Sequence, residues 1–232
     1  METKTQKTKA YLLDIILSSP IGTKIPSERE LMSHLNYSRP TVQNAIDALI
    51  NEGYLYRVER QGTFIAQNRL CATLNHLSSF NEEARNLGVT PITQVIESSV
   101  LTADSYLSEK MNIPIGEKIY YFLRLRKHAN TPICLDYSFY ASFAVSHIST
   151  RVAEGSIYNY IENVKKLSIS SSISTIEALL PEDEIAQLLC VEKTEPLLLI
   201  ERLSRLNDGR IFEHTISYVV SKHYKIAINS IR

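Results

Sequence analysis

The chain contains no run of 18 or more apolar residues, so it lacks a segment long enough to cross a bilayer as a helix. Its first residues, up to Lys9, are polar and include no apolar stretch of the kind found in secretory signals. These absences predict a cytoplasmic protein that has no membrane partner.

Cysteine and glycine are both scarce. Cys71, Cys134 and Cys190 lie far apart without the paired spacing of a metal site, which predicts buried free thiols. The seven glycines form no Gly-x-Ser-x-Gly elbow and no Gly-x-x-x-x-Gly-Lys loop, and His-Glu-x-x-His is also absent. The six histidines are dispersed, and we expect His128 and His214 to be structural or solvated. We therefore expect no enzyme activity, no metal and no cofactor.

Net charge gives no sign of a nucleic-acid partner, because 25 Lys and Arg balance 25 Asp and Glu. A length of 232 residues with 44% hydrophobic content is nevertheless enough for two folded domains. Any affinity for DNA must then come from the local placement of basic residues, chiefly Arg29, Arg39, Arg57 and Arg60.

A capping box predicts where one helix begins. Ser27 can accept from the backbone of Glu30 while the Glu30 side chain returns to the Ser27 amide. Leu31 and Leu35 follow one turn apart, and Asn36–Tyr37 break the pattern. A helix from Ser27 and a tight turn are expected.

A second helix is predicted from Ser38, a possible N-cap, to Gly53, a possible C′ residue. Apolar residues at i, i+3, i+4 and i+7 form its buried face: Val42, Ala45, Ile46 and Leu49. Its opposite face is polar in the first turns, where a recognition helix reaches base edges and phosphates: Arg39, Thr41, Gln43 and Asn44. Two short strands, 54–57 and 62–66, then predict a hairpin, the wing.

These segments resemble the GntR family of bacterial transcription regulators, whose signature runs Pro-Ser-Glu-Arg, Ser-Arg-x-Thr-Val and Gly-x-Gly-Thr-Phe. The resemblance covers roughly residues 10–66. It implies a winged helix-turn-helix on double-stranded DNA, with contacts from these positions: Arg29, Ser38, Arg39, Thr41, Gly62 and Thr63. Arg29 could instead pair only with Glu30 or Glu52.

Two positions depart from the family pattern. Gln43 stands where a basic residue is usual, and Arg60 stands where the first wing glycine is usual. Gln43 can read adenine, and bidentate contacts of that kind discriminate by about 1–3 kcal/mol. We therefore include Gln43, Asn44 and Arg60 among the DNA-contacting candidates and expect an operator that differs from those of relatives.

Three parts are expected along the chain: a winged helix-turn-helix domain at 1–66, a linker at 67–76, and a second domain at 77–232. The second domain should begin with a short helix at 79–88 and a strand at 92–100.

An internal duplication shows when the chain is shifted by 78 residues against itself. The segment Leu123–Arg126 then aligns with Glu201–Ser204, and Asp136 aligns with His214. A helix precedes each copy, at 104–111 and at 181–189, with Pro181 expected in the first turn of the latter. Each copy reads as a helix followed by a hairpin, which predicts an α+β fold with one antiparallel sheet.

This second half resembles the UTRA effector domain of the HutC subfamily of GntR regulators, which shares its fold with chorismate lyase. The resemblance covers about residues 75–228 and rests on four segments in order: 77–80 with 87–88, 123–126, 155–158 and 211–214. It implies that the second domain binds a small effector and dimerises.

Strand alternation places Arg124 and Arg126 on one face, and Cys134, Asp136 and Ser138 on one face of the partner strand. The arginines can hold an anion, or can simply pair with Asp136 or Glu201 across the sheet.

Ser156 and Tyr158 lie in the first turn of an expected helix, where free amides favour an anion. Sugar-phosphate-sensing members hold the phosphate at the positions of Arg124, Arg126, Ser156 and Tyr158. In those members, acids at the positions of Asp136 and Glu213 meet sugar hydroxyls. The remaining effector candidates are Phe80 and Asn81 at the entrance and Tyr218 at the far wall.

The sequence therefore predicts a homodimeric repressor that binds a palindromic operator and is released by a small anionic metabolite such as a sugar phosphate. Two alternatives stay open: a lyase- or hydrolase-like enzyme of chorismate-lyase-like fold tethered to DNA, and an architectural DNA protein that binds no small molecule.

Overall fold

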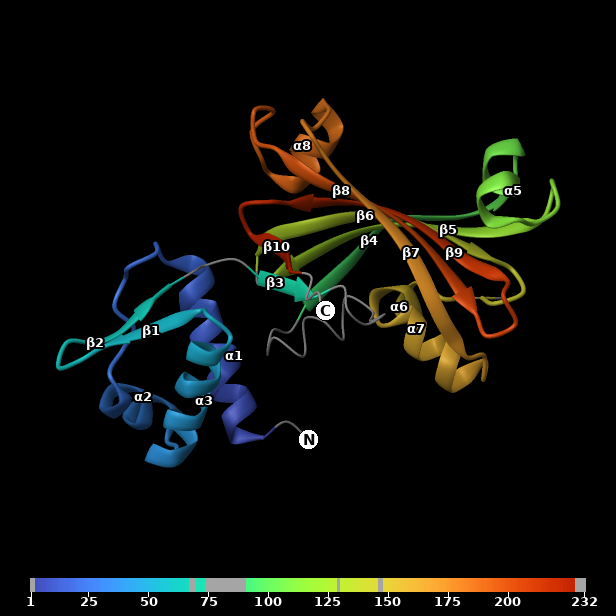
Figure 1. Ribbon diagram of the computed structural model, residues 1–232. Coiled ribbons are helices and arrows are strands. Elements are labelled where there is room, and N and C mark those ends of the chain that lie inside the picture. The colour runs from blue at the N-terminus through green and yellow to red at the C-terminus, as the bar shows by residue number, and fades with distance from the viewer. Residues whose placement is uncertain (1–2, 67–69, 74–90, 129, 146–147, 228–232) are drawn as a thin grey trace, which may run out of the picture. The chain divides into compact units, whose positions relative to one another are not determined.

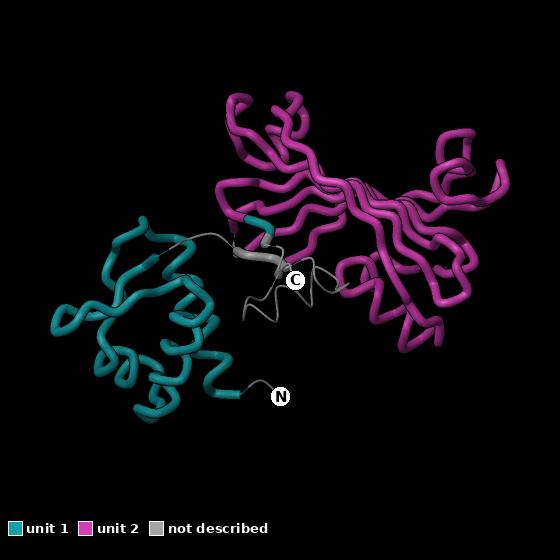
Figure 2. The backbone as a smooth tube through the Cα atoms, in the orientation of Figure 1, with its two compact units in different colours: residues 1–73, 82–90, 225–227 teal, residues 74–81, 91–224, 228–232 magenta. Residues whose placement is uncertain are grey.

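The computed structural model describes residues 3–66, 70–73, 91–128, 130–145 and 148–227. Two compact units divide the chain (Figure 2): residues 3–66 belong to the first, and 91–224, apart from the undescribed positions, belong to the second. Within the expected linker, β3 (Leu70–Thr73) forms a two-stranded ladder with β10 (Tyr224–Ala227). The helix expected at 79–88 lies outside the described residues. No described helix is long and apolar enough to cross a membrane.

The first unit consists of three helices and a hairpin (Figure 1): α1 (Lys4–Ser18), α2 (Glu28–Leu35), α3 (Arg39–Asn51), β1 (Leu55–Val58) and β2 (Gly62–Ile65). The Ser27–Glu30 capping box is formed, and α2 begins after Ser27 as predicted. Helix α3 follows Ser38, and Gly53 beyond its end has a φ of 76°. Helix α1, which begins at a capping box of Thr3 and Gln6, was not predicted from the sequence.

The core of the first unit joins α1 to α3. Leu12, Leu13 and Ile16 of α1 are fully buried, and the predicted apolar face of α3, from Val42 to Leu49, is buried with them. These two helices pack together and leave the other face of α3 to solvent. The hydrophobic pattern thus presents the polar first turns of α3 outward.

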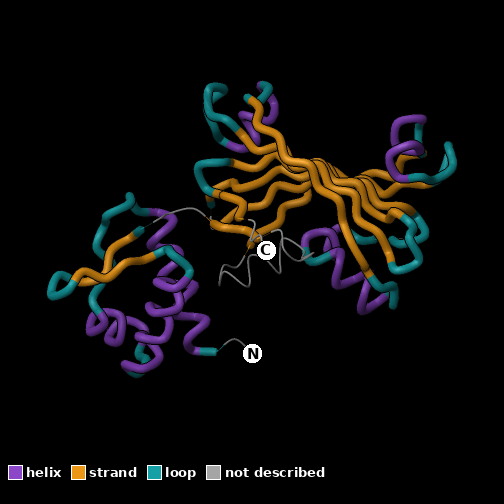
Figure 3. Tube along the Cα trace, in the orientation of Figure 1, coloured by secondary structure: helices purple, strands orange, loops and turns teal. Residues whose placement is uncertain are grey.

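The second unit is built on one antiparallel six-stranded sheet (Figure 3), in the order β4-β5-β6-β9-β8-β7. Its elements are β4 (Pro91–Thr102), α5 (Ser105–Met111), β5 (Lys118–His128), β6 (Thr131–Ala141), α6 (Thr150–Glu154), α7 (Ile157–Asn159), a π-helical turn η1 (Tyr160–Val164), β7 (Ile169–Leu179), α8 (Asp183–Leu189), β8 (Leu197–Leu206) and β9 (Ile211–Val220). The fold is α+β, as predicted.

The duplication is larger than expected. Helices α5 and α8 are offset by the same 78 residues as the two hairpins, and β7 repeats β4 at that offset. Each copy is therefore a strand, a helix and a hairpin, and the two copies meet where β6 pairs with β9. Pro181 precedes the N-cap residue Glu182 and does not enter the first turn of α8, which Asp183 and Glu184 occupy.

The sheet has two differently covered faces (Figure 1). Helices α5 and α8 lie over one face, where Met111 of α5 clusters with Ile119, and Leu189 of α8 clusters with Leu123 and Leu135. Helices α6 and α7 lie over the other face, against Phe122 and Tyr140. We call the latter the polar face, because the even-numbered side chains of β5 and β6, including Arg124, Arg126 and Asp136, point to it.

Candidate functional site

The predicted recognition surface is present on α3. Arg39 and Asn44 are exposed, Thr41 and Gln43 are half-buried, and the Ser38 hydroxyl lies 2.9 Å from that of Thr41. Arg39 retains 68% of its side-chain surface, so its guanidinium is accessible to a phosphate or a base edge. These residues share the solvent-facing side of one helix.

Glu28, at the start of α2, holds this surface in place. Its carboxylate accepts from Arg39 Nε at 3.3 Å and from Gln43 Nε2 at 3.0 Å, and it lies 3.9 Å from Arg57 Nη2. Arg57 also donates to Asp47 at 3.2 Å. The sequence analysis did not assign Glu28 a role, although it is the acid of the Pro-Ser-Glu-Arg segment. Its contacts make Glu28 a positioning residue for Arg39, Gln43 and Arg57.

The wing pairs β1 with β2 from Leu55↔Ile65 to Val58↔Gly62. Arg60 at its tip is 91% exposed and has a φ of 60°, a backbone conformation that favours glycine. Gly62 has a φ of 125°, and a Cβ on it would lie 2.7 Å from Lys24 Cε. Lys24 forms an isolated antiparallel backbone bridge with Phe64 of β2. It is therefore a further cation beside the wing.

Arg29 is exposed on α2. The carboxylate of Glu30 accepts from Ser27, and that of Glu52 accepts from Lys9 at 2.7 Å. Within the described residues, no ion pair joins Arg29 to either acid, so this alternative is not supported. Arg29 remains available to a partner such as a phosphate.

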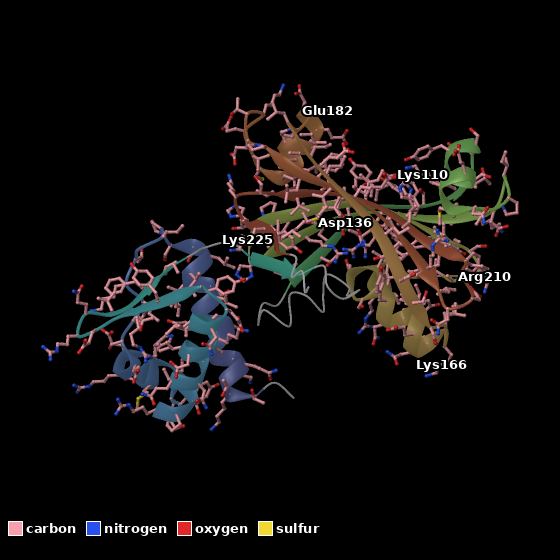
Figure 4. All side chains as sticks on the ribbon, in the orientation of Figure 1. Lys110, Asp136, Lys166, Glu182, Arg210 and Lys225 are labelled. Atoms are coloured by element: carbon pink, nitrogen blue, oxygen red, sulfur yellow. The ribbon has the colours of Figure 1, made fainter. Side chains whose placement is uncertain are left out.

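A buried charge network lies at the centre of the polar face (Figure 4). Arg124 and Asp136 are register partners on β5 and β6, and Arg126 Nε donates to Asp136 Oδ2. Cys134 and Ser217 donate to the other carboxylate oxygen at 3.0 and 2.7 Å. Burial by itself raises the pKa of Asp136, but Arg126 and Arg124 outweigh it and hold the pKa well below its usual range. Asp136 is therefore an ionised partner of Arg126.

Arg124 has a different environment. It is only 3% exposed, and its Nη2 donates to the hydroxyls of Ser138 at 3.0 Å and Tyr140 at 3.1 Å. Its nearest approach to Asp136 is 3.9 Å. Its Nε is buried and has no hydrogen-bond partner among the described residues. Of the two arginines, Arg124 is therefore the one with unused donor capacity.

Glu213 collects hydroxyl groups at the neighbouring part of the polar face. Its carboxylate accepts from Tyr158 at 2.6 Å, from Ser204 at 2.7 Å and from Tyr140 at 2.8 Å. Burial, then the nearby Glu213 carboxylate, raises the pKa of Tyr158 well above its usual value, so the phenol stays protonated. Ser156 is the N-cap residue of α7, where its hydroxyl accepts from the Asn159 amide at 3.2 Å.

The structure brings most of the effector candidates together: Arg124, Arg126, Asp136, Tyr158 and Glu213 belong to one connected polar network. Tyr218 is not part of it. Tyr218 packs edge-on against Tyr137 on the face covered by α8, because it and Glu213 stand an odd number of residues apart in β9. Phe80 and Asn81 lie outside the described residues.

The alternative pairing of the arginines is confirmed only for Asp136. Glu201 lies on the opposite face, where its carboxylate accepts from Lys110 at 2.7 Å and lies 2.8 Å from His214 Nε2. His214 is fully buried and structural rather than solvated. The sequence analysis also missed Tyr140 and Ser204, whose alternation with Ser138 and Arg202 was readable in the strands.

Two family models match the chain. The model described as "Bacterial regulatory proteins, gntR family" matches residues 4–65, and the "UTRA domain" model matches residues 86–225. The chain is 29% identical to the mannosyl-D-glycerate transport/metabolism system repressor MngR of Escherichia coli (strain K12) over 209 residues. This alignment covers 89% of this chain and 86% of that protein.

A second relative is the HTH-type transcriptional repressor NagR of Bacillus subtilis (strain 168), 30% identical over 200 residues, with 86% of this chain and 82% of that protein covered. Among solved structures, PhnF from Mycobacterium smegmatis superposes with a TM-score of 0.68 at 22% identity, over 97% of this chain and 99% of that chain. The last comparison supports the fold of both units.

Proposed function

This chain belongs to the GntR family of bacterial regulatory proteins and is a DNA-binding transcriptional repressor with a UTRA effector domain; on that premise, we propose that a small anionic metabolite, such as a sugar phosphate, releases it from its operator. The family and its relatives are regulators rather than enzymes, which removes the tethered lyase or hydrolase. We place its action in the cytoplasm, where bacterial operators are.

The observation that carries the effector proposal is the buried guanidinium of Arg124. A buried polar group without a partner is costly, and a buried cation is more so. Arg124 donates only to neutral hydroxyls among the described residues and keeps a buried Nε without a partner. The nearest carboxylate, that of Asp136, lies 3.9 Å away and accepts from Arg126 instead. An anion would supply the missing acceptor for Arg124, and a planar guanidinium suits phosphate or carboxylate.

The other polar residues take supporting roles in the proposed site. Asp136 holds Arg126 by an ion pair, and Glu213 orients Tyr158 through its hydroxyl. Ser156 begins the helical turn that carries Tyr158. A phosphate next to Arg124, with hydroxyls toward Glu213, fits this distribution of donors and acceptors.

We further propose that the repressor is a homodimer on a palindromic operator, with two α3 helices in successive major grooves roughly 34–36 Å apart. The effector would favour a dimer geometry in which the two helices no longer match the half-sites. Thermodynamic linkage makes this coupling reciprocal. If effector lowers operator affinity by a given factor, operator DNA must lower effector affinity by the same factor. Sedimentation of the purified protein, alone and with a palindromic duplex, tests the dimer directly.

A thermal-shift screen tests the effector proposal. The full-length protein is heated with sugar phosphates, carboxylic acids or phosphonates, because a ligand of the folded state raises the unfolding temperature. We expect a sugar phosphate to stabilise the wild type and not Arg124→Ala. Stabilisation that persists in Arg124→Ala would place the anion elsewhere.

Operator binding is tested separately with Arg39→Ala. We expect this variant to lose operator affinity while keeping the thermal shift of the effector, since Arg39 lies in the other unit. Lys7→Ala on α1 is a charge-matched surface control, because Lys7 is exposed and lies outside the recognition helix. Full operator affinity in Arg39→Ala would remove α3 from the proposed interface.

A further inference from the structure

Among the buried side-chain atoms that lack hydrogen-bond partners in the described residues, Thr93 Oγ1, Arg124 Nε and Thr215 Oγ1 lie on the polar face. They belong to three strands, β4, β5 and β9. Thr215 is 7% exposed, so bulk water does not satisfy its hydroxyl. Because buried polar groups in folded proteins are nearly always paired, an unpaired buried atom of this kind is a candidate contact for a ligand.

Thr215 belongs to a line of polar side chains that begins at Arg124. Arg124 donates to Ser138, Ser138 is the register partner of Thr215, and Thr215 is the register partner of Arg202. Register partners point to the same face of a sheet, so this line crosses the junction of the two repeats on the polar face. From Ser138 to Arg202 it spans two strand spacings, about 10 Å.

Arg202 is the counterpart of Arg124 in the second repeat, at the 78-residue offset. It is half-buried, and its Nε donates to Ser174 at 3.4 Å. Its guanidinium also lies close enough to Tyr158 to oppose the rise in the pKa of that phenol, which burial dominates. Arg202 therefore stands on the same side of the sheet as the Tyr158–Glu213 pair.

We propose that Thr215 and Arg202 form a second polar subsite, which binds the end of the effector remote from the anion held by Arg124. The inference rests on the proposed function and deepens it. The effector class is a phosphorylated polyhydroxy compound of about hexose length, with a carboxylate or a row of hydroxyls at its far end. Thr215 supplies a hydroxyl and Arg202 a guanidinium fork, which together suit an oxygen-rich group.

The test measures binding of three probes to the full-length protein by isothermal titration calorimetry: inorganic phosphate, glucose 6-phosphate and 6-phosphogluconate. Arg202→Met should weaken both sugar probes by about tenfold or more and leave inorganic phosphate within about twofold, because phosphate alone cannot reach the second subsite. Arg205→Met is the matched control on the same strand, since Arg205 points to the opposite face from Ser204 and bonds Gly209. It should bind all three probes as the wild type does.

Thr215→Val separates binding from folding. It removes a buried hydroxyl that has no partner among the described residues, so the variant should unfold at or above the wild-type temperature. It should still weaken the sugar probes by about threefold or more, an effect that a purely structural role would not produce.

Each outcome has a distinct meaning. Wild-type affinity for both sugar probes in Arg202→Met and Thr215→Val would overturn the second subsite, while loss of all three probes in Arg124→Met would keep the first. Full affinity in Arg124→Met, or no saturable binding of any probe to the wild type, would overturn the proposed function and the subsite with it.

Discussion

Arg124 and Arg126 lie two residues apart on one strand, yet the loss of stability on their removal should differ severalfold. Arg126→Met takes away the direct ion-pair partner of Asp136 and leaves a buried carboxylate that is 4% exposed. Removing one partner of a buried pair typically costs about 3–5 kcal/mol, because the remaining charge is uncompensated. Cys134 and Ser217 still donate to Asp136 but are neutral. Arg124 is 3.9 Å away and donates to Ser138 and Tyr140, so it does not replace the direct bond from Arg126.

Arg124→Met leaves that ion pair in place. The hydroxyls of Ser138 and Tyr140 lose one donor each, and Tyr140 keeps its bond to Glu213. The substitution also removes a buried Nε that has no partner among the described residues, which offsets part of the loss. The net change in the free energy of unfolding should therefore be no more than about 1 kcal/mol.

Thermal unfolding followed by circular dichroism distinguishes the two variants. For a chain of this size about 1 kcal/mol shifts the midpoint by roughly 2–4 °C. Arg126→Met should lower the midpoint by about 6–20 °C, and Arg124→Met by no more than about 4 °C. Arg124→Met should nevertheless lose the stabilisation by sugar phosphate. Equal losses of stability, or a larger loss in Arg124→Met, would refute the assignment of Arg126 as the structural arginine.

A double variant checks the physical cause. The double variant combines Arg126→Met with Asp136→Leu and so removes the uncompensated carboxylate. Most of the stability lost in Arg126→Met alone should therefore return. If the double variant is less stable than Arg126→Met alone, hydrogen bonding by Asp136 to Cys134 and Ser217 outweighs the charge effect.

Three further perturbations test other parts of the molecule. Arg60→Gly should raise the free energy of unfolding by up to about 1 kcal/mol in urea titrations, because the residue has a φ of 60°, and an unchanged or lower value would contradict this source of strain. Glu28→Ala should reduce the ratio of operator to random-DNA affinity about tenfold, since Arg39 and Gln43 lose their common acceptor; an unchanged ratio in gel-shift titrations would remove its positioning role. Burial lowers the pKa of His214 below 6.5, although Glu201 opposes the shift, so the unfolded state binds the proton more readily. Stability should then fall as the pH drops below about 6.5, by up to about 1.4 kcal/mol per pH unit, and His214→Gln should flatten this slope in urea titrations between pH 5 and 8.

The sequence alone determined the elements whose signals are local or repeated. The Ser27–Glu30 capping box and the apolar spacing up to Leu49 depend on residues within a few turns of one another, so α2 and α3 could be placed correctly. The 78-residue duplication compares the chain with itself, which is why both hairpins and their helices were found. Strand alternation also predicted the common face of Arg124 and Arg126.

Only the tertiary structure decided how these side chains are partnered. Whether Arg124 or Arg126 pairs with Asp136 depends on the register of β5 against β6 and on rotamers, which no local signal specifies. The hydroxyl cluster at Glu213 joins four separate elements of the fold, and α1 completes the core of the first unit without a strong pattern of its own. Chemistry at this site arises from burial and cross-strand contacts, and those exist only once strands distant in sequence lie side by side.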